Sequence, residues 1–417
     1  MKIRGYLSPA IASDFIRKIA ETFAARIVII AIGLITTVIV ARILGPEGRG
    51  LYAVALAVGT IGVQFSNLGL HASNTYYVAQ DHNLLPTLLG NTIVVSFVVG
   101  GFGAALAWCV FTFWPNLAPI NGVLLMMALI WIPIGLAYLL MQNLLIGIHE
   151  IRTYNFIEVV TKILGVSLIA IVILVDAVSV ENIFLMGLVA LIISFIWGLA
   201  KLKCHLKHFP KPSISLFKKN LRYGFKAYLV AFLGFMVLRV DLLMVQYLLG
   251  AEQAGYYSIA ATMADMVYML PVVVGMILFP KISAINNIDE KWKKTRTATI
   301  ITGMIMLCIT VLATVLASPV VNLLFSKEYS PAITAFIFLL PGIFFLAIET
   351  IVVQFLNSIG LPKILVYFWL FTTLFNIFFN YFFIPIYGIK GASIVSSASY
   401  FIIFVLISVY TTKIIKN

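Results

Sequence analysis

Residues 364–384 read ILVYFWLFTTLFNIFFNYFFI, a run without a charged side chain. In a helix, about 20 such residues cross the ~30 Å hydrocarbon layer of a membrane. A second uncharged run, at residues 301–316, has the same character. Backbone in hydrocarbon must satisfy its own polar groups, so it forms helices or a closed barrel, and barrel strands alternate apolar and polar residues. These runs do not alternate, which predicts membrane-spanning helices.

The rest of the chain is built in the same way. Of its 417 residues, 62% are hydrophobic and 10% are charged, whereas about a quarter of a soluble domain is charged. We predict an all-α membrane protein with about twelve spans, at roughly residues 19–41, 51–77, 88–112, 121–147, 156–175, 182–200, 225–249, 256–279, 298–318, 333–356, 364–384 and 391–411. The first run is too long for a cleaved signal peptide. The three cysteines are scattered without metal or redox spacing, so no cofactor is expected.

The basic residues are distributed unevenly over the predicted loops. If the N-terminus is cytoplasmic, 21 of the 28 Lys and Arg residues lie in inside segments, four lie in outside loops and three lie within spans. This positive-inside pattern predicts that both termini are cytoplasmic. It also accounts for the net charge of +13 without nucleic acid as a partner. The basic stretch 201–224 divides the chain into halves 1–200 and 225–417, and we interpret it as a charged cytoplasmic linker at the surface of the membrane, with binding to anionic lipid headgroups as a further role.

The two halves share a motif. LGPEGRGLYAVA at residues 44–55 aligns with LGAEQAGYYSIA at residues 249–260, at an offset of 205 residues and with six identities in twelve positions. Each copy is expected to form a tight outer loop between the first two spans of its half, with glycine supplying positive φ. Pro133 and Pro341 correspond in the fourth span of each half. A parallel repeat of this kind suggests a binding site between the halves and a rocking motion.

Several motifs, taken in order along the chain, resemble those of the bacterial polysaccharide flippases, the O-antigen and capsule unit exporters of the multidrug/oligosaccharidyl-lipid/polysaccharide superfamily. The matching segments are ARILGPEGRGLY (41–52), LIGI (145–148), YN (154–155), RVDLL (239–243), FPKIS (279–283), Asn376 with Asn380, and IPIYGIKGA (384–392). The resemblance covers nearly the whole chain, although the first half has no counterpart of the asparagine pair.

This resemblance implies a fold and a function. The expected fold is two pseudo-symmetric six-helix bundles around a central cavity. The expected activity is to move an undecaprenyl-diphosphate-linked oligosaccharide, such as an O-antigen, capsule or exopolysaccharide unit, from the cytoplasmic to the periplasmic leaflet of the inner membrane. No covalent bond would change. A polysaccharide polymerase and chain-length proteins are the partners that such a role implies.

Charged residues within spans are costly and therefore mark candidate sites. Arg26, in the first span, would bind a diphosphate in the cavity or pair with a carboxylate on another helix. Arg239 and Asp241 lie near the middle of the seventh span, on different helix faces, and Asp265 reaches a similar depth in the eighth. An Arg239–Asp265 ion pair is therefore expected, with sugar binding or ion coupling as the alternatives for this group.

Four further charges complete the candidate set. Glu158 and Lys162 have i,i+4 spacing, so we expect them to neutralise each other, with Lys162 as a cavity cation in the alternative interpretation. Glu349 has no partner four residues away and, if protonated, would suit proton coupling. Arg49, at the outer end of the second span, either faces the exit or is a solvated loop charge.

Asn376 and Asn380 share one helix face and are expected to join helices by hydrogen bonding rather than to bind substrate. Two other functions fit the sequence less well. A membrane polymerase or ligase would need catalytic groups on a sizeable outer loop, and the chain has no P-loop, zinc-binding HExxH or nucleophile elbow. A drug or cation antiporter of the same superfamily would want an acidic cavity, whereas the membrane acids and bases here are mixed.

Overall fold

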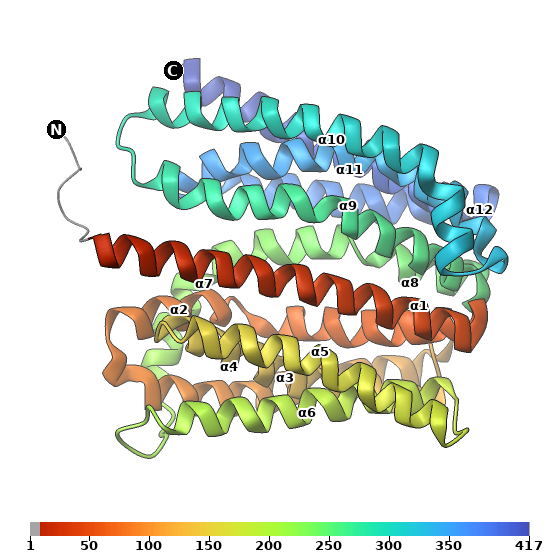
Figure 1. The fold of residues 1–417 in the computed structure, drawn as a ribbon, viewed down its shortest axis with the longest axis horizontal. Coiled ribbons are helices and arrows are strands. Elements are labelled where there is room, and N and C mark those ends of the chain that lie inside the picture. Colours follow the sequence, from red (N-terminus) through yellow and green to blue (C-terminus); the bar gives the residue numbers. More distant parts are fainter. Residues whose placement is uncertain (1–8, 417) are drawn as a thin grey trace. The chain divides into compact units, whose positions relative to one another are not determined.

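The computed structural model describes residues 9–416, with side chains described from residue 25 onward. Lys2 and Arg4, which contribute to the predicted cytoplasmic N-terminus, lie outside the described residues. Every regular element in the described part is a helix (Figure 1), which confirms the all-α class. The α-helices are α1 (Pro9–Asn67), α2 (Leu70–Gln80), α3 (Leu85–Phe113), α4 (Gly122–Gly147), α5 (Ile151–Leu174), α6 (Val180–Lys203), α7 (Ile214–Val237), α8 (Val240–Leu249), α9 (Ala251–Ser283), α10 (Ile288–Leu324), α11 (Ser330–Ser358) and α12 (Ile364–Lys416).

Two helices are too long to be single membrane spans. At about 1.5 Å per residue, the 59 residues of α1 would measure about 88 Å, against a hydrocarbon layer of ~30 Å. Each of the two contains one glycine with non-helical backbone, Gly45 (φ 66°) in α1 and Gly388 (φ 61°) in α12. Ten helices of the described chain are long and apolar enough to cross a membrane. Dividing α1 and α12 at these glycines turns the ten into the twelve spans that the hydropathy predicts.

The repeated loops begin as the sequence predicts. Gly45 and Gly250, which correspond at the offset of 205, both have positive φ (66° and 90°). Each stands directly before the second span of its half, so the turn chemistry of the two copies is the same. Pro133 and Pro341 also lie inside α4 and α11, as expected.

The chain forms two compact units. Unit 1 contains Met1–Val40, Gly62–Cys109 and Val123–Phe225. Unit 2 contains Ala41–Ile61, Val110–Gly122 and Lys226–Asn417. The first repeated loop, at residues 44–55, therefore packs with the same unit as the second, at residues 249–260. The division at residues 201–224 that the basic stretch suggests stays a prediction.

Each unit has its own packed interior. In unit 1, fully buried Leu88, Leu144, Ile157 and Leu202 bring α3, α4, α5 and α6 into one cluster. In unit 2, α11 packs against α9, α10 and α12. In the apolar 18-residue stretch of each helix, 61% of the residues of α11 are buried, compared with 28% of those of α10. Lipid tails are as apolar as leucine, so close van der Waals packing and hydrogen bonds hold such helices together.

Two helix breaks are not visible in the sequence pattern. The predicted second span, 51–77, is interrupted at Leu68 and Gly69, both with positive φ, and continues as α2. The seventh span is interrupted between Val237 and Val240, which separates α7 from α8. Broken helices in transporters expose backbone and polar groups at membrane depth, where ions and substrates bind. The second break places Arg239 and Asp241 at the start of α8.

The turn at Gly45 should depend on backbone conformation alone, because a Cβ atom there would meet no atom within 4 Å. We expect Gly45→Ala to lower the free energy of unfolding by about 1–3 kcal/mol, since the backbone of Gly45 (φ 66°, ψ −177°) lies in a region that residues with a Cβ atom rarely adopt. Gly33, a helical glycine of α1 with equally open surroundings, is the matched control, and Gly33→Ala should be neutral or stabilise by up to ~1 kcal/mol. Denaturant unfolding in detergent measures both, and equal shifts would show that the turn does not need positive φ.

Candidate functional site

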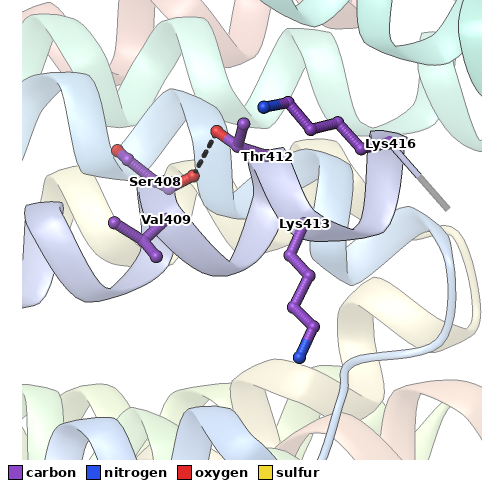
Figure 2. Close-up of a pocket in the computed structure, with 5 residues that line it drawn as sticks. All are labelled: Ser408, Val409, Thr412, Lys413 and Lys416. Carbon is purple, nitrogen blue, oxygen red and sulfur yellow. Dashed lines mark hydrogen bonds between the residues drawn. The ribbon is translucent and has the colours of Figure 1, made fainter.

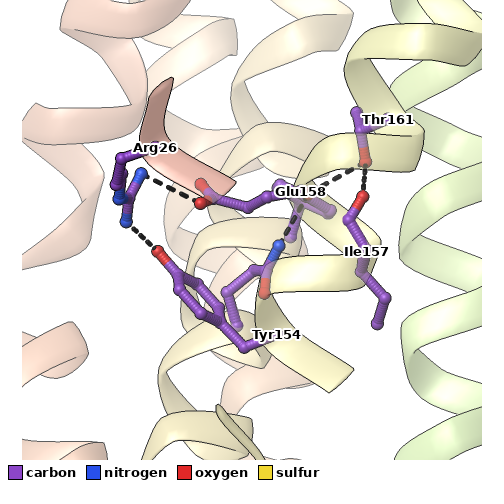
Figure 3. Close-up of polar contacts among 7 residues, drawn as sticks. Arg26, Tyr154, Ile157, Glu158 and Thr161 are labelled. Atoms are coloured by element: carbon purple, nitrogen blue, oxygen red, sulfur yellow. Dashed lines mark hydrogen bonds and ion pairs between the residues drawn. The ribbon is translucent and has the colours of Figure 1, made fainter. Parts of the chain in front are cut away.

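Unit 1 holds a charged cluster between α1 and α5 (Figure 3). The guanidinium of Arg26 lies 2.9 Å from the Glu158 carboxylate and donates a hydrogen bond of 2.5 Å to the Tyr154 hydroxyl. The Arg26 and Glu158 side chains are 31% and 25% exposed, so the pair is largely removed from water. Of the two interpretations that the sequence allows for Arg26, the structure forms the pair with a carboxylate on another helix.

A layer of neutral polar groups continues from this cluster. The Tyr138 hydroxyl lies 3.0 Å from the Thr161 hydroxyl and accepts a hydrogen bond of 2.6 Å from the buried Gln142. Thr161 in turn bonds to the carbonyl of Ile157, at 2.6 Å (Figure 3). These contacts join α4 to α5 beside Glu158, so the ionic cluster stands next to hydrogen-bonding groups rather than bare hydrocarbon.

Lys162, the second basic residue predicted within the spans of unit 1, is not paired as predicted. The predicted Glu158–Lys162 pair is wrong, because Glu158 is taken by Arg26. In the described part of the chain Lys162 makes no ion pair, and its side chain is exposed. It also lies deeper than predicted, at the middle of α5, since this helix begins at Ile151 rather than near residue 156.

Unit 2 holds the second ionic cluster, at the break between α7 and α8. Arg239 pairs with Asp265 of α9 at 2.8 Å, which confirms the expected ion pair. The two side chains are 32% and 39% exposed. Arg239 itself has non-helical backbone (φ −134°), so its side chain leaves the chain at the point where the helix is interrupted.

Asp241 is buried immediately beyond this break. It is 3% exposed and accepts hydrogen bonds from the Tyr257 hydroxyl (2.5 Å), the Ser396 hydroxyl (2.8 Å) and the backbone N–H of Leu242 (2.8 Å). Its donors are thus three neutral groups, from α8, α9 and α12.

The asparagine pair extends this network. Asn376 donates to the hydroxyl of Ser399 at 3.1 Å and lies 3.5 Å from that of Ser396, while Asn380 donates to the side-chain oxygen of Asn376 at 2.9 Å. Both asparagines are fully buried, and the predicted role in joining helices is confirmed. The side-chain oxygen of Asn380 has no hydrogen-bond partner, so an acceptor remains free inside the network.

Two further predicted charges are buried in unit 2 without an opposite charge among the described residues. Glu349 of α11 is 3% exposed, and its Oε1 has no hydrogen-bond partner. Arg49 of α1 is 6% exposed, and its Nε has no partner either. The guanidinium of Arg49 lies 5.6 Å from the centre of the Tyr52 ring. The interpretation of Arg49 as a solvated loop charge is therefore wrong.

A pocket at the end of α12 has a different character (Figure 2). It is lined by Ser408, Val409, Thr412, Lys413 and Lys416. None of the charged residues singled out within the spans lines it. Its lysines belong to the terminal basic residues that the positive-inside pattern places on the membrane surface.

Sequence reasoning did not assign Tyr154, Tyr257 or Ser396 a part in these clusters. A signal for Tyr257 existed in the repeat, because Tyr52 and Tyr257 are among its six identities. Tyr52 lies against Arg49, and Tyr257 holds Asp241. Ser396 carries no comparable signal, since one serine among several in the last span marks no special position.

The geometry defines a polytopic helical membrane protein with charged and polar groups held at broken helices, which is the architecture of a transporter. The fold is similar to those of the lipid II flippase MurJ in an inward closed conformation (TM-score 0.75, 18% identity, covering 95% of this chain and 87% of MurJ) and of an inward-facing multidrug resistance MATE transporter of the MOP superfamily (TM-score 0.73, 16% identity, 92% and 94%). At this identity the likeness establishes the fold.

A polysaccharide biosynthesis protein family model matches residues 39–334, and the chain belongs to this family. One relative, from Shigella flexneri, is named as an O-antigen transporter and is 22% identical over 369 residues, covering 85% of this chain and 87% of the relative. Another, an uncharacterized membrane protein of Methanocaldococcus jannaschii, is 24% identical over 404 residues, covering 88% and 78%.

The Arg26–Glu158 pair should couple more strongly than an ion pair on the surface. In a double-mutant cycle of Arg26→Gln and Glu158→Gln we expect a coupling on the order of 1 kcal/mol in unfolding free energy. The control pair, Lys294–Glu290, is more than half exposed and should couple by about 0.3–0.5 kcal/mol. Equal coupling in the two cycles would show that the Arg26 cluster is as well solvated as the surface.

Proposed function

We propose that this protein is a flippase that moves an undecaprenyl-diphosphate-linked oligosaccharide from the cytoplasmic to the outer leaflet of the cell membrane by alternating access. Membership of the polysaccharide biosynthesis family supports the class of cargo, and the Shigella relative is named for O-antigen transport. The positive-inside pattern supports cytoplasmic termini. A polymerase and chain-length proteins would act on the product.

The observation that carries the proposal is Lys162. It lies at the middle of α5, is exposed and has no counter-ion among the described residues. An ammonium group at this depth is costly in hydrocarbon and beyond easy reach of the headgroups, so a position facing a hydrated passage is favoured. A cation that no protein carboxylate neutralises is available for an anion. The diphosphate of the cargo would supply that anion. The contact would be a charge-assisted hydrogen bond from the ammonium group of Lys162 to a phosphate oxygen.

Arg26 and Arg239 take a different role in this proposal. Each is already held by a carboxylate, at 2.9 Å and 2.8 Å. A paired cation binds an added anion less strongly than a free one, because the two anions repel each other. We therefore propose that each of these pairs fixes helices within its own unit and hydrogen-bonds the sugars, whereas Lys162 makes the primary contact with phosphate.

The proposed binding role of Lys162 can be tested by lipid transfer in reconstituted vesicles. We expect Lys162→Gln to reduce leaflet exchange of a labelled polyprenyl-diphosphate oligosaccharide by about tenfold or more, since one charge-assisted contact contributes ~1.5–3 kcal/mol and about 1.4 kcal/mol corresponds to a factor of ten. Lys293→Gln, the same change on an exposed lysine of α10, is the control and should transfer normally. Normal transfer by both variants would remove Lys162 from the mechanism. Efflux of small cations without lipid transfer by the wild type would favour a drug or cation antiporter.

The energy source is proposed to enter at the buried acids of unit 2. Asp241 accepts hydrogen bonds from the hydroxyls of Tyr257 and Ser396, and Ser396 links it to the asparagine pair, in which the side-chain oxygen of Asn380 is free. We propose that oxygen atoms of this kind suit a monovalent cation such as Na⁺. Glu349, without a cation or a partner for Oε1, suits a proton, because a neutral carboxyl group is the cheaper form in such surroundings. Asp265 is neutralised by Arg239 and is assigned to structure.

These two assignments make separable predictions. If sodium drives transfer, we expect Asp241→Asn to abolish the acceleration by an imposed Na⁺ gradient, while Glu349→Gln keeps it. If protons drive transfer, the two variants should exchange roles under an imposed pH gradient. Transfer would be followed in vesicles with each gradient in turn. A wild type that responds to neither gradient, or variants that keep the full response, would contradict ion coupling at these acids.

A further inference from the structure

The two repeated loops meet each other in a reciprocal way. Gly50 has Gly255 as its repeat counterpart, and Pro46 has Ala251. A Cβ atom at Gly50 would overlap the carbonyl oxygen of Ala251, and a Cβ atom at Gly255 would overlap that of Pro46. In each copy the glycine thus lies directly against the backbone carbonyl of the residue four positions before the glycine of the other copy. We call this contact, made by residues 44–50 and 249–255 within unit 2, the outer latch.

Further hydrogen bonds hold the first loop in place. The side chain of Arg42 donates to the carbonyls of Leu323 and Leu324, at 2.5 and 2.7 Å, at the end of α10. The hydroxyl of buried Tyr329 donates to the carbonyl of Ala41 at 2.8 Å. The latch therefore has a specific closed form, with glycines where any side chain would separate the loops.

Arg49 directly precedes Gly50 in the first loop and is buried, with its guanidinium 5.6 Å from the centre of the Tyr52 ring. It is 6% exposed, its Nε has no partner, and no carboxylate pairs with it among the described residues. Packing does not require its charge, because the counterpart of Arg49 in the second loop is Ala254, which is fully buried. A buried cation without a counter-ion is unfavourable. The side chain is therefore explained better by an anion that it meets than by the closed form itself.

We propose that Arg49 is an anion subsite at the predicted outer end of the spans, covered when the latch is closed and available when it opens, and that its ligand is the diphosphate group of the cargo. This inference rests on the proposed flippase function. A ligand shifts an equilibrium toward the form that it binds better. Since the anion reaches Arg49 only in the open form, arrival of the diphosphate favours opening. The two loops would then close again on an empty site.

The test opens the latch by mutation and uses inorganic pyrophosphate as the probe, on the full chain in detergent. Gly50→Ala places a methyl group in the contact, while Gly33→Ala, with nothing within 4 Å, is the matched control. Spin labels on Glu47 and Glu252, which are exposed and correspond in the repeat, report the separation of the loops in a background without Cys109, Cys204 and Cys308. We expect Gly50→Ala to lengthen this distance and to bind pyrophosphate about tenfold more tightly than wild type, within the usual range of coupling.

Adding Arg49→Ala to Gly50→Ala should remove the gain in pyrophosphate affinity without closing the loops, since alanine already fills this position in the second copy. Gly255→Ala, which opens the same contact from the other loop, repeats the experiment if Gly50→Ala does not fold. An open latch whose pyrophosphate affinity is unchanged, or is independent of Arg49, would overturn the subsite. Loops that stay together in both glycine variants would overturn the latch.

Lipid transfer measured in parallel separates this inference from the flippase function. A wild type that transfers lipid but has no Arg49-dependent anion site would contradict the subsite and leave the flippase function standing.

Discussion

Across the hydrocarbon layer, no water is present to satisfy a charge or a backbone polar group, so each must find its partner within the protein. This constraint explains most of the polar contacts of both units. Arg26 reaches Glu158 on a helix more than 130 residues away in the chain, Arg239 reaches Asp265, and Asp241 collects three neutral donors around its carboxylate. The same constraint makes the helix breaks informative. At the break at residues 238–239 the backbone N–H groups still bond to carbonyls of α7, while Arg239 and Asp241 lie directly at this point and Asp265 pairs with the arginine.

Against this background the charges without partners stand out. Apart from Asp241, which three neutral donors hold, Lys162, Arg49 and Glu349 are the predicted site residues that no opposite charge neutralises in the described part of the chain. A structural role explains a paired charge well, because the ion pair offsets the cost of removing the charge from water. It explains an unpaired charge poorly, because that charge lowers the stability of the fold and no ion pair offsets the loss. In the proposed mechanism each meets its partner only during transport, a diphosphate for the two cations and a proton for the acid. The distribution of counter-ions thus separates residues that build the passage from those that act in it.

The sequence allowed a large part of the fold to be predicted, and the reason is local. Span number, helical class and the glycine turns at Gly45 and Gly250 depend on hydropathy and on backbone conformation, which neighbouring residues determine. The Arg239–Asp265 pair was also predictable, because its helices are consecutive. The partner of Glu158 was not. Lys162 stands four residues away in the favourable order, and nothing in the sequence indicates that α1 brings a guanidinium closer. The burial of Arg49 was missed for the same reason, since it depends on a loop some 200 residues away in the chain.

Several of these long-range contacts involve corresponding positions of the two repeat copies. The positions at which the copies differ are as informative as those at which they are identical. Tyr52 and Tyr257 correspond, yet the first lies against the cation Arg49 and the second donates to the anion Asp241. Glycines 50 and 255 correspond and do the same thing, which is to let two backbones touch. Gene duplication alone would leave like residues in like surroundings. The backbone contacts have kept that symmetry, while the charges have lost it. A cargo with a single diphosphate at one end needs such asymmetry, because a site that is symmetric in charge would bind it equally well in two opposite orientations.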